Sequence, residues 1–244
     1  MLINADVKSL ELVTAAYLSR DKVMMRELRE RVDIHGDNQA KFDLPERRIA
    51  KIFVFRLIYG GSAYSYARDP DFNWISTNWK YWQRAIDAFY EKYEGMHRWH
   101  EFLVQTVSEY WELVLPTGRI YPYSLVTAPN GERIMPRTTI LNYPVQGLGA
   151  DMVAIARTNF FDQFLSYDWG RQRPMLVSSV HDSLLVDSPV EHVDAVAQML
   201  NTAVNTAPET FERLFDTPFD LPLLAEVQVG PNLKEMQDYA NDAA

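Results

Sequence analysis

Cysteine is missing from this chain, and histidine is scarce. The sequence has no cysteine and only five scattered histidines among 244 residues. Disulfides and thiolate metal sites are therefore excluded, and a zinc cluster is not expected. Any metal that the protein binds should be a hard cation held by carboxylate oxygens.

Long apolar runs and an excess of positive charge are missing as well. No apolar run approaches the ~18 residues of a membrane span, and the first residues have neither a basic nor a long hydrophobic stretch. We therefore predict a cytoplasmic protein without membrane contact. The formal net charge of −9 argues against a protein that coats nucleic acid through bulk charge, although a local groove could still bind it. A hydrophobic content of 47% supports a sizeable core.

Four side chains of contrasting chemistry recur at every fourth position between residues 45 and 61. They are two cations followed by two aromatic residues, Arg47, Lys51, Phe55 and Tyr59. Because four residues advance an α-helix by about 400°, these side chains form one slowly turning stripe. A proline at residue 45 and glycines at residues 60 and 61 supply helix start and stop signals. The cations could hold phosphates near the positive end of the helix dipole, and the rings could face a sugar and a base.

The same stretch admits a simpler interpretation. In it the helix is amphipathic, its basic residues are solvated, and its core side is formed by Ile49, Ile52, Phe53 and Leu57. A four-residue repeat also arises by chance, so the spacing alone does not choose between the two interpretations.

The remaining patterns predict a mixed α+β fold. Strands are expected over residues 2–5, 175–180, 184–187 and 223–229, hairpins within 113–136, and helices over about 10–17, 21–31, 76–111 with a break near 95, 144–165 and 190–204. Asp6 follows the first strand, and Asp182 lies in the tight turn between the second and third. The two carboxylates could therefore meet across adjacent strands of one sheet.

Several ordered motifs give almost the whole chain a resemblance to the polymerase domain of the family A DNA polymerases, the DNA polymerase I type. In chain order, the matching stretches are Asp6 to Leu12 with Asp33-Ile-His35 (motif A), Arg47-x3-Lys51-x3-Phe55-x3-Tyr59-Gly60 (motif B), Asn142-Tyr-Pro-Val-Gln146 (a primer-template motif), Val180-His181-Asp182 (motif C) and the ending Glu226 to Asn232. Motifs in the right order and spacing are more specific than any one of them alone.

The resemblance implies a polymerase fold with a palm and fingers. The palm, an antiparallel sheet with packed helices, is expected from residues 1–18 and 137–244, and helical fingers from 19–136. Only one strand precedes motif A, so the thumb and a proofreading exonuclease are expected to be absent.

The resemblance also implies template-directed DNA synthesis, in which a primer 3′-hydroxyl attacks a deoxynucleoside triphosphate. Asp6 and Asp182 would be the catalytic carboxylates that hold two Mg²⁺ ions. The implied nucleotide contacts are Glu11, His35, Arg47, Lys51, Phe55 and Tyr59, with Glu11 as a steric gate under the sugar. The implied DNA contacts are Arg119, Arg137, Asn142, Gln146 and His181.

Some positions depart from the family pattern and keep alternatives open. Val7 and Lys8 replace the usual Tyr-Ser of motif A, and Ser183 stands where an acidic residue usually follows His-Asp. Single-subunit RNA polymerases share the palm and often carry His-Asp-Ser, so an enzyme of that kind is one alternative. A palm that only binds DNA or a replication partner is another.

The expected absence of a thumb leads to a prediction about partners. We expect a phage or split-gene form of the polymerase, in which a separate chain supplies the thumb and possibly an exonuclease, because many phosphate contacts are needed to hold DNA. Such a palm should expose an apolar patch near residues 1–4 and along its sheet edge.

Overall fold

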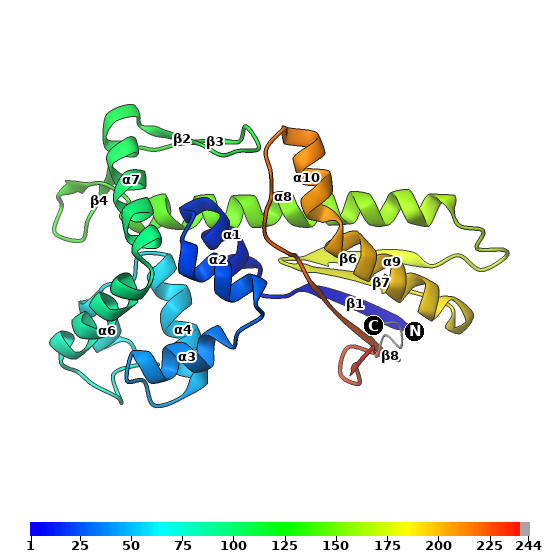
Figure 1. Ribbon diagram of the computed structural model, residues 1–244, viewed down its shortest axis with the longest axis horizontal. Helices are drawn as coiled ribbons and strands as arrows, with labels where there is room; N and C mark the ends of the chain where they lie inside the picture. Colours follow the sequence, from blue (N-terminus) through cyan, green and yellow to red (C-terminus); the bar gives the residue numbers. More distant parts are fainter. Residues whose placement is uncertain (240–244) are drawn as a thin grey trace. The chain divides into compact units, whose positions relative to one another are not determined.

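The computed structural model describes residues 1–239, which form helices, one five-stranded sheet and two small hairpins (Figure 1). The elements are β1 (Leu2–Val7), α1 (Leu10–Ser19), α2 (Lys22–Arg29), α3 (Ile34–Lys41), α4 (Arg47–Ile58), α5 (Ala63–Arg68), α6 (Trp79–Lys92), α7 (Glu94–Tyr110), β2 (Glu112–Val114), β3 (Ile120–Pro122), β4 (Val126–Thr127), β5 (Arg133–Ile134), α8 (Arg137–Ser166), β6 (Met175–Val180), β7 (Ser183–Asp187), η1 (Val190–His192), α9 (Val193–Asn205), α10 (Ala207–Phe215), β8 (Ala225–Gly230) and β9 (Gln237–Asp238). The mixed α+β prediction is confirmed.

The chain divides into two compact units. The first, which we call the sheet unit, contains residues 1–10 and those from 148 onward, and the second, the helical unit, contains residues 11–147. The boundary at residue 147 falls inside α8. This division comes from packing, whereas the expected palm and fingers boundaries are functional assignments that remain a prediction.

The sheet unit is built on β1, which lies between two antiparallel neighbours. The strand order is β6-β7-β1-β8-β9, and every neighbouring pair is antiparallel. Residues on β1 alternate between buried and half-buried, with Ile3, Ala5 and Val7 buried. This period of two is that of a strand covered on one face. On that side α9 packs against β1 and β8.

The helical unit is organised around α4. One side of this helix is fully buried, with Ile49, Phe53 and Leu57 at 0–1% exposure, and the Phe53 ring packs against the rings of Tyr66 and Trp82. Both interpretations of the four-residue repeat thus describe part of α4: its apolar side enters the core, and the stripe of Arg47, Lys51, Phe55 and Tyr59 lies outside it.

Helix ends account for most differences from the expected elements. The expected helix at 144–165 begins at Arg137, with Pro144 inside it. Here Pro136 precedes the first turn, and a proline further along removes one helical N–H without ending the helix. Helices α3, α5 and α10 are short and were not expected. They begin at local cap or proline signals rather than at long apolar periodicities.

The expected apolar patch near residues 1–4 is wrong. Ile3 is completely buried, and Met1, Leu2 and Asn4 are half-buried, because β1 is an interior strand rather than an edge. The other half of the prediction, an apolar sheet edge, is confirmed at the edge strand β6, where Met175, Val177 and Val180 are exposed. Within residues 1–239, none of the helices combines the length and apolar character that crossing a bilayer requires.

Candidate active site

The carboxylates of Asp6 and Asp182 meet as expected, at the end of the β1–β7 pair that lies next to the β6–β7 turn. Asp6 lies opposite Ser183, and the Val7 N–H donates a hydrogen bond of 2.9 Å to the Asp182 carbonyl. The carboxyl groups of Asp6 and Asp182 are close enough to share a hydrogen bond. The tight turn between β6 and β7 carries Asp182, and the pairing of β1 with β7 brings it next to Asp6, which is far away in sequence.

The environment of Asp6 favours its protonated form. Burial raises the pKa of Asp6 from 3.8 to about 6, with further contributions from the charge and hydrogen bond of Asp182 and from the charge of Glu226. Glu226 lies opposite Asp6 on β8 and forms a 3.1 Å ion pair with Lys8. Two carboxylates this close repel each other once both are ionised, and a bound cation would relieve that repulsion.

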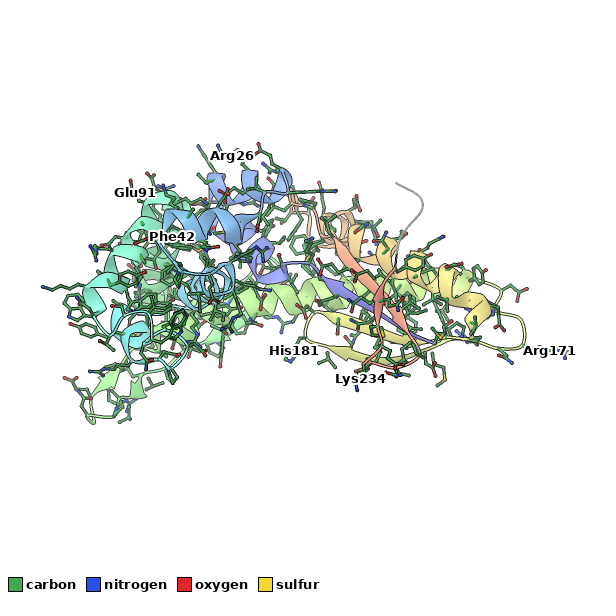
Figure 2. The ribbon with its side chains drawn as sticks, turned by 90° about the horizontal axis from the view of Figure 1, so that it is seen from below. Arg26, Phe42, Glu91, Arg171, His181 and Lys234 are labelled. Carbon is green, nitrogen blue, oxygen red and sulfur yellow. The ribbon has the colours of Figure 1, made fainter. Side chains whose placement is uncertain are left out.

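The hairpin tip carries His181, as Figure 2 shows, in an exposed position. Its φ of 53° lies in the left-handed region that turn residues adopt. The next position but one, Ser183, donates a hydrogen bond of 3.0 Å from its hydroxyl to the Val180 carbonyl and so closes the turn. Its hydroxyl thus has a structural function here.

The donor set of Asp6 and Asp182 suits a hard divalent cation. Both ligands are carboxylates, and the charge of Asp182 disfavours ionisation of Asp6. Among residues 1–239, no cluster of three or more His, Cys, Asp or Glu surrounds the position. A cation held by this pair would therefore need further oxygen ligands from water or substrate, as Mg²⁺ usually does.

Arg47, the first cation of the stripe on α4, is held by Asp33. Its guanidinium donates to both carboxylate oxygens of Asp33, at 2.8 Å from Nη2 and 2.9 Å from Nε. This hydrogen bond is the main reason why the pKa of Asp33 falls to about 2. Asp33 also caps α3 by accepting from the Gly36 N–H. The arginine is thus oriented but paired, and an incoming phosphate would compete with Asp33 for it.

His35 lies on α3 beside the stripe. Its side chain is buried, its ring centroid is 5.7 Å from that of Phe55, and its Nδ1 has no hydrogen-bond partner. Burial lowers the pKa of His35 to about 4, and the positive charges of Lys51 and Arg47 lower it further. Three predicted nucleotide contacts, Arg47, Lys51 and Phe55, therefore lie near one neutral imidazole that is ready to donate or accept a hydrogen bond.

The hydroxyl of Tyr59 joins three predicted residues from different helices. It accepts a hydrogen bond from Gln146 Nε2 on α8, and it also hydrogen-bonds with the carboxylate of Glu11 in the first turn of α1. Burial raises the pKa of Tyr59, and the charge of Glu11 raises it further. A carboxylate that accepts from a half-buried phenol is restricted in position, which a steric gate requires.

The remaining predicted DNA contacts lie at the start of α8 and in the β2–β3 hairpin. Asn142 is half-buried, one helical turn before Gln146. Arg137 begins α8. Burial raises the pKa of Tyr90 and lowers that of His100, and the positive charge of Arg137 opposes the first shift and adds to the second, so Arg137 lies near α6 and α7. Arg119 is exposed beside the β2–β3 turn, where its carbonyl accepts from the Leu115 N–H.

Sequence reasoning missed the partners of these side chains. In the sequence, Asp33 stands out only as part of a motif, although its Asp-x-x-Gly spacing is that of a helix cap. Glu226 stands out only as part of the ending, and no sequence pattern marks Arg56.

Comparison with known proteins explains the motif order. The family profile described as DNA polymerase family A matches residues 1–235. The chain belongs to DNA polymerase family A. Over nearly its whole length, it is 24% identical to DNA polymerase I of Chloroflexus aurantiacus, covering 98% of this chain and 24% of that protein. It is 26% identical to DNA polymerase I of Borreliella burgdorferi, with corresponding shares of 97% and 25%. The chain thus spans about a quarter of the length of these relatives.

A solved structure supports the fold of this family A chain. The POL domain of Pol1 from M. smegmatis, in complex with DNA primer-template and dNTP, resembles it with a TM-score of 0.75 at 22% identity. The likeness covers 93% of this chain and 38% of that one.

Proposed function

We propose that this chain carries out template-directed DNA synthesis, transferring a nucleotide from a deoxynucleoside triphosphate to a primer 3′-hydroxyl. The observation that carries the proposal is the Asp6–Asp182 pair, because a divalent cation would relieve the repulsion between two carboxylates that face each other at the ends of adjacent strands. The family relationship supports the same reaction.

Asp6 and Asp182 would hold two Mg²⁺ ions. When bound, these ions stabilise the charge that develops on the attacking and leaving oxygens. The two carboxylates themselves fix the ligand oxygens on a rigid β1–β7 pair, and His181 at the exposed tip would contact the primer end. Ser183 would not take the role of the acidic residue that usually follows His-Asp in the family, since its hydroxyl closes the turn.

The helical unit would supply the nucleotide contacts. Arg47 and Lys51 would bind phosphates, with His35 as a supporting contact, while Phe55 and Tyr59 would face the sugar and the nascent base pair. Glu11, held by Tyr59, would exclude a 2′-hydroxyl. Arg119, Arg137, Asn142 and Gln146 would contact DNA. In this proposal residues 1–18 and 137–244 act as palm and residues 19–136 as fingers.

We also propose that a separate chain supplies the thumb and possibly an exonuclease, in a split or phage-encoded enzyme. The acidic net charge supports this, because phosphate contacts dominate affinity for DNA. Purified alone, the chain should extend primers weakly and distributively at moderate salt. Processive synthesis without any other protein would contradict this part of the proposal.

The direct test is primer extension with Mg²⁺, comparing deoxynucleotides with ribonucleotides. Extension with deoxynucleotides that disappears in Asp182→Asn supports a DNA polymerase. A preference for ribonucleotides would indicate the RNA polymerase alternative. Primer-template binding without any extension would indicate a DNA-binding palm.

A further inference from the structure

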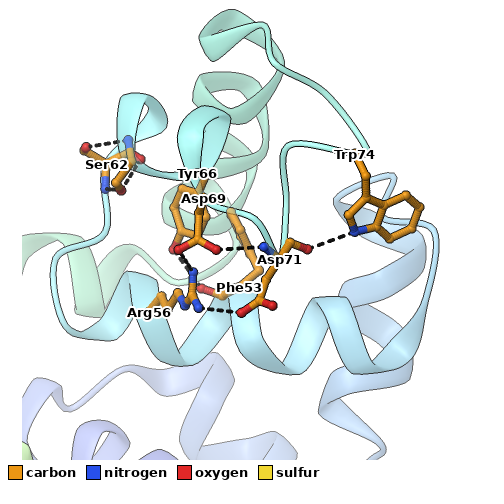
Figure 3. Close-up of polar contacts among 8 residues, drawn as sticks. Phe53, Arg56, Ser62, Tyr66, Asp69, Asp71 and Trp74 are labelled. Carbon is orange, nitrogen blue, oxygen red and sulfur yellow. Dashed lines mark hydrogen bonds and ion pairs between the residues drawn. The ribbon is translucent and has the colours of Figure 1, made fainter.

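Arg56 is the one cation of α4 that points into a cluster of side chains from the next segment of the chain. Figure 3 shows its guanidinium between two carboxylates, one from Asp69 and one from Asp71. The bond to Asp71 is 2.8 Å. The guanidinium carbon also lies 4.8 Å from the centroid of the Phe72 ring, which is completely buried. A planar guanidinium can make all these contacts at once, whereas an ammonium cannot.

The segment that Arg56 holds is itself ordered by Asp69 and Asp71. The Asp71 N–H donates to Asp69 Oδ1 at 2.9 Å, which forms a tight turn, and Trp74 Nε1 donates to the Asp71 carbonyl at 3.0 Å. We call residues 69–74 the clamp loop. Trp74 is 57% exposed at the end of this loop. Arg56 is therefore bonded to the two residues on which the loop conformation depends.

One further contact joins α4 to α5, and another closes the end of α4. The Tyr66 hydroxyl donates a buried 2.9 Å hydrogen bond to the Phe53 carbonyl, and the Gly61 N–H donates to the Arg56 carbonyl at 2.8 Å. A side chain at Gly61 would meet the Tyr66 hydroxyl at 2.6 Å, so the chain approaches closely here. The second half of α4 is thus attached to α5 through the Tyr66 side chain and to the clamp loop through the Arg56 side chain.

These attachments all lie in the second half of α4, which carries Phe55 and ends just before Tyr59. Arg47, at the other end of the helix, is held separately by Asp33. The two ends of the stripe are therefore supported by different parts of the helical unit: the phosphate end by α3, and the sugar and base end by the clamp loop.

We propose that Arg56 is a positioning residue for nucleotide selection. By bonding Asp69 and Asp71 against Phe72, it makes the second half of α4 and the clamp loop one rigid body, so that Phe55 and Tyr59 meet the sugar and base at a fixed angle. Arg56 does not touch the substrate. This role of Arg56 rests on the proposed nucleotide-binding function of α4. It extends that function from binding the nucleotide to selecting the correct one.

The functional test compares Arg56→Met with the matched variant Arg68→Met. Arg68 is an exposed arginine of α5, so its replacement removes the same charge one residue from Asp69. In Arg56→Met we expect discrimination between correct and mismatched deoxynucleotides to fall roughly threefold to tenfold, while KM for the correct nucleotide changes less than about twofold. Arg56→Lys should recover only part of the loss, and Arg68→Met should resemble the parent chain.

A second measurement does not depend on activity. Because the chain has no cysteine, Arg48→Cys and Asn73→Cys would place spin labels uniquely on α4 and on the clamp loop. The distance distribution between them should be narrow in the parent and in Arg68→Met, and it should broaden in Arg56→Met at temperatures where all three remain folded by circular dichroism.

The possible outcomes distinguish a failure of the proposed function from a failure of the selectivity role of Arg56. A parent chain that shows no nucleotide addition, even with a thumb-bearing partner, would refute the proposed function and with it the selectivity role. If the parent is active but Arg56→Met discriminates as Arg68→Met does, the inference is overturned and the proposed function stands. An unchanged label distribution in Arg56→Met would also overturn it, since no rigid body would depend on Arg56.

Discussion

Asp6 in the sheet unit and Asp33 in the helical unit are both candidate-site aspartates, but their carboxyl groups have opposite pKa shifts. Asp6 is partly buried and faces Asp182, and its pKa rises to about 6. Asp33 is exposed and faces Arg47, and its pKa falls to about 2. The sheet unit therefore places two like charges side by side, whereas the helical unit pairs two opposite charges.

This difference indicates what each region is prepared to bind. The Asp6–Asp182 pair lacks a positive partner from the protein, so a divalent cation would relieve its repulsion. Arg47 already has an anionic partner, so a phosphate must either displace Asp33 or share the Arg47 guanidinium with it. Metal binding should consequently be strongly coupled to the protonation of its site, whereas phosphate binding should be a competition between anions.

The largest expected effect comes from breaking the like-charge pair. Asp6→Asn or Asp182→Asn should reduce Mg²⁺-dependent primer extension about a thousandfold or more, because each removes a shared ligand while keeping the side-chain shape. Ser183→Ala is the control and should lose little activity, since its hydroxyl only closes the turn. Near-normal extension by either Asn variant would remove that residue from the metal site.

The next largest effect is expected at Glu11, the proposed steric gate against ribonucleotides. Glu11→Ala should reduce discrimination against ribonucleotides roughly tenfold to a hundredfold, because the carboxylate that fills the space is lost. Tyr59→Phe keeps Glu11 but removes the hydroxyl that holds it, so it should give a smaller change in the same direction. The measurement is the ratio of kcat/KM for ribonucleotide and deoxynucleotide. A ratio unchanged by Glu11→Ala would exclude Glu11 as the gate.

Breaking the opposite-charge pair should have a modest effect. Asp33→Asn can still cap α3 but no longer competes for Arg47, so KM for the nucleotide should fall about twofold to fivefold. Arg47→Ala should raise KM instead. If Asp33→Asn raises KM as well, Asp33 orients the arginine rather than competing for it.

The smallest effect is on stability. A carboxyl group whose pKa is higher in the folded than in the unfolded chain binds more protons when folded, so stability falls as pH rises from about 4 to about 6 and stays low above that. Asp6→Asn should remove this penalty and raise Tm at pH 7 by about 2–4 °C, allowing for the partial exposure of the group. At pH 3.5 the Tm values should converge. A variant less stable than the parent at pH 7 would contradict the burial of an unrelieved charge pair.

Features encoded in local spacing could be predicted from the sequence. The stripe on α4 follows from a repeat of four residues, and the meeting of Asp6 with Asp182 follows from a strand, a turn and a return strand. The predicted start of α8 at about residue 144 was wrong. The sequence alone does not show whether a proline such as Pro144 lies in the first turn of a helix or inside it.

Contacts between separate segments could not be predicted in this way. The Arg47–Asp33 pair spans 14 residues and the Arg56–Asp71 pair 15, and no periodicity links their members. The bond between Tyr59 and Gln146 spans 87 residues. Such pairs depend on how helices pack, which single-sequence patterns do not encode.

The most direct test of the cation-binding pair is the titration of aspartate carboxyl groups by NMR, with ¹³C-labelled aspartate and with Asp6→Asn to assign the signal. Without Mg²⁺, we predict one carboxyl signal with a midpoint near pH 6 that is missing in Asp6→Asn. With Mg²⁺, this midpoint should move to lower pH, because a bound cation favours the ionised carboxylate. An Asp6 signal that titrates near pH 4 and does not respond to Mg²⁺ would contradict the account.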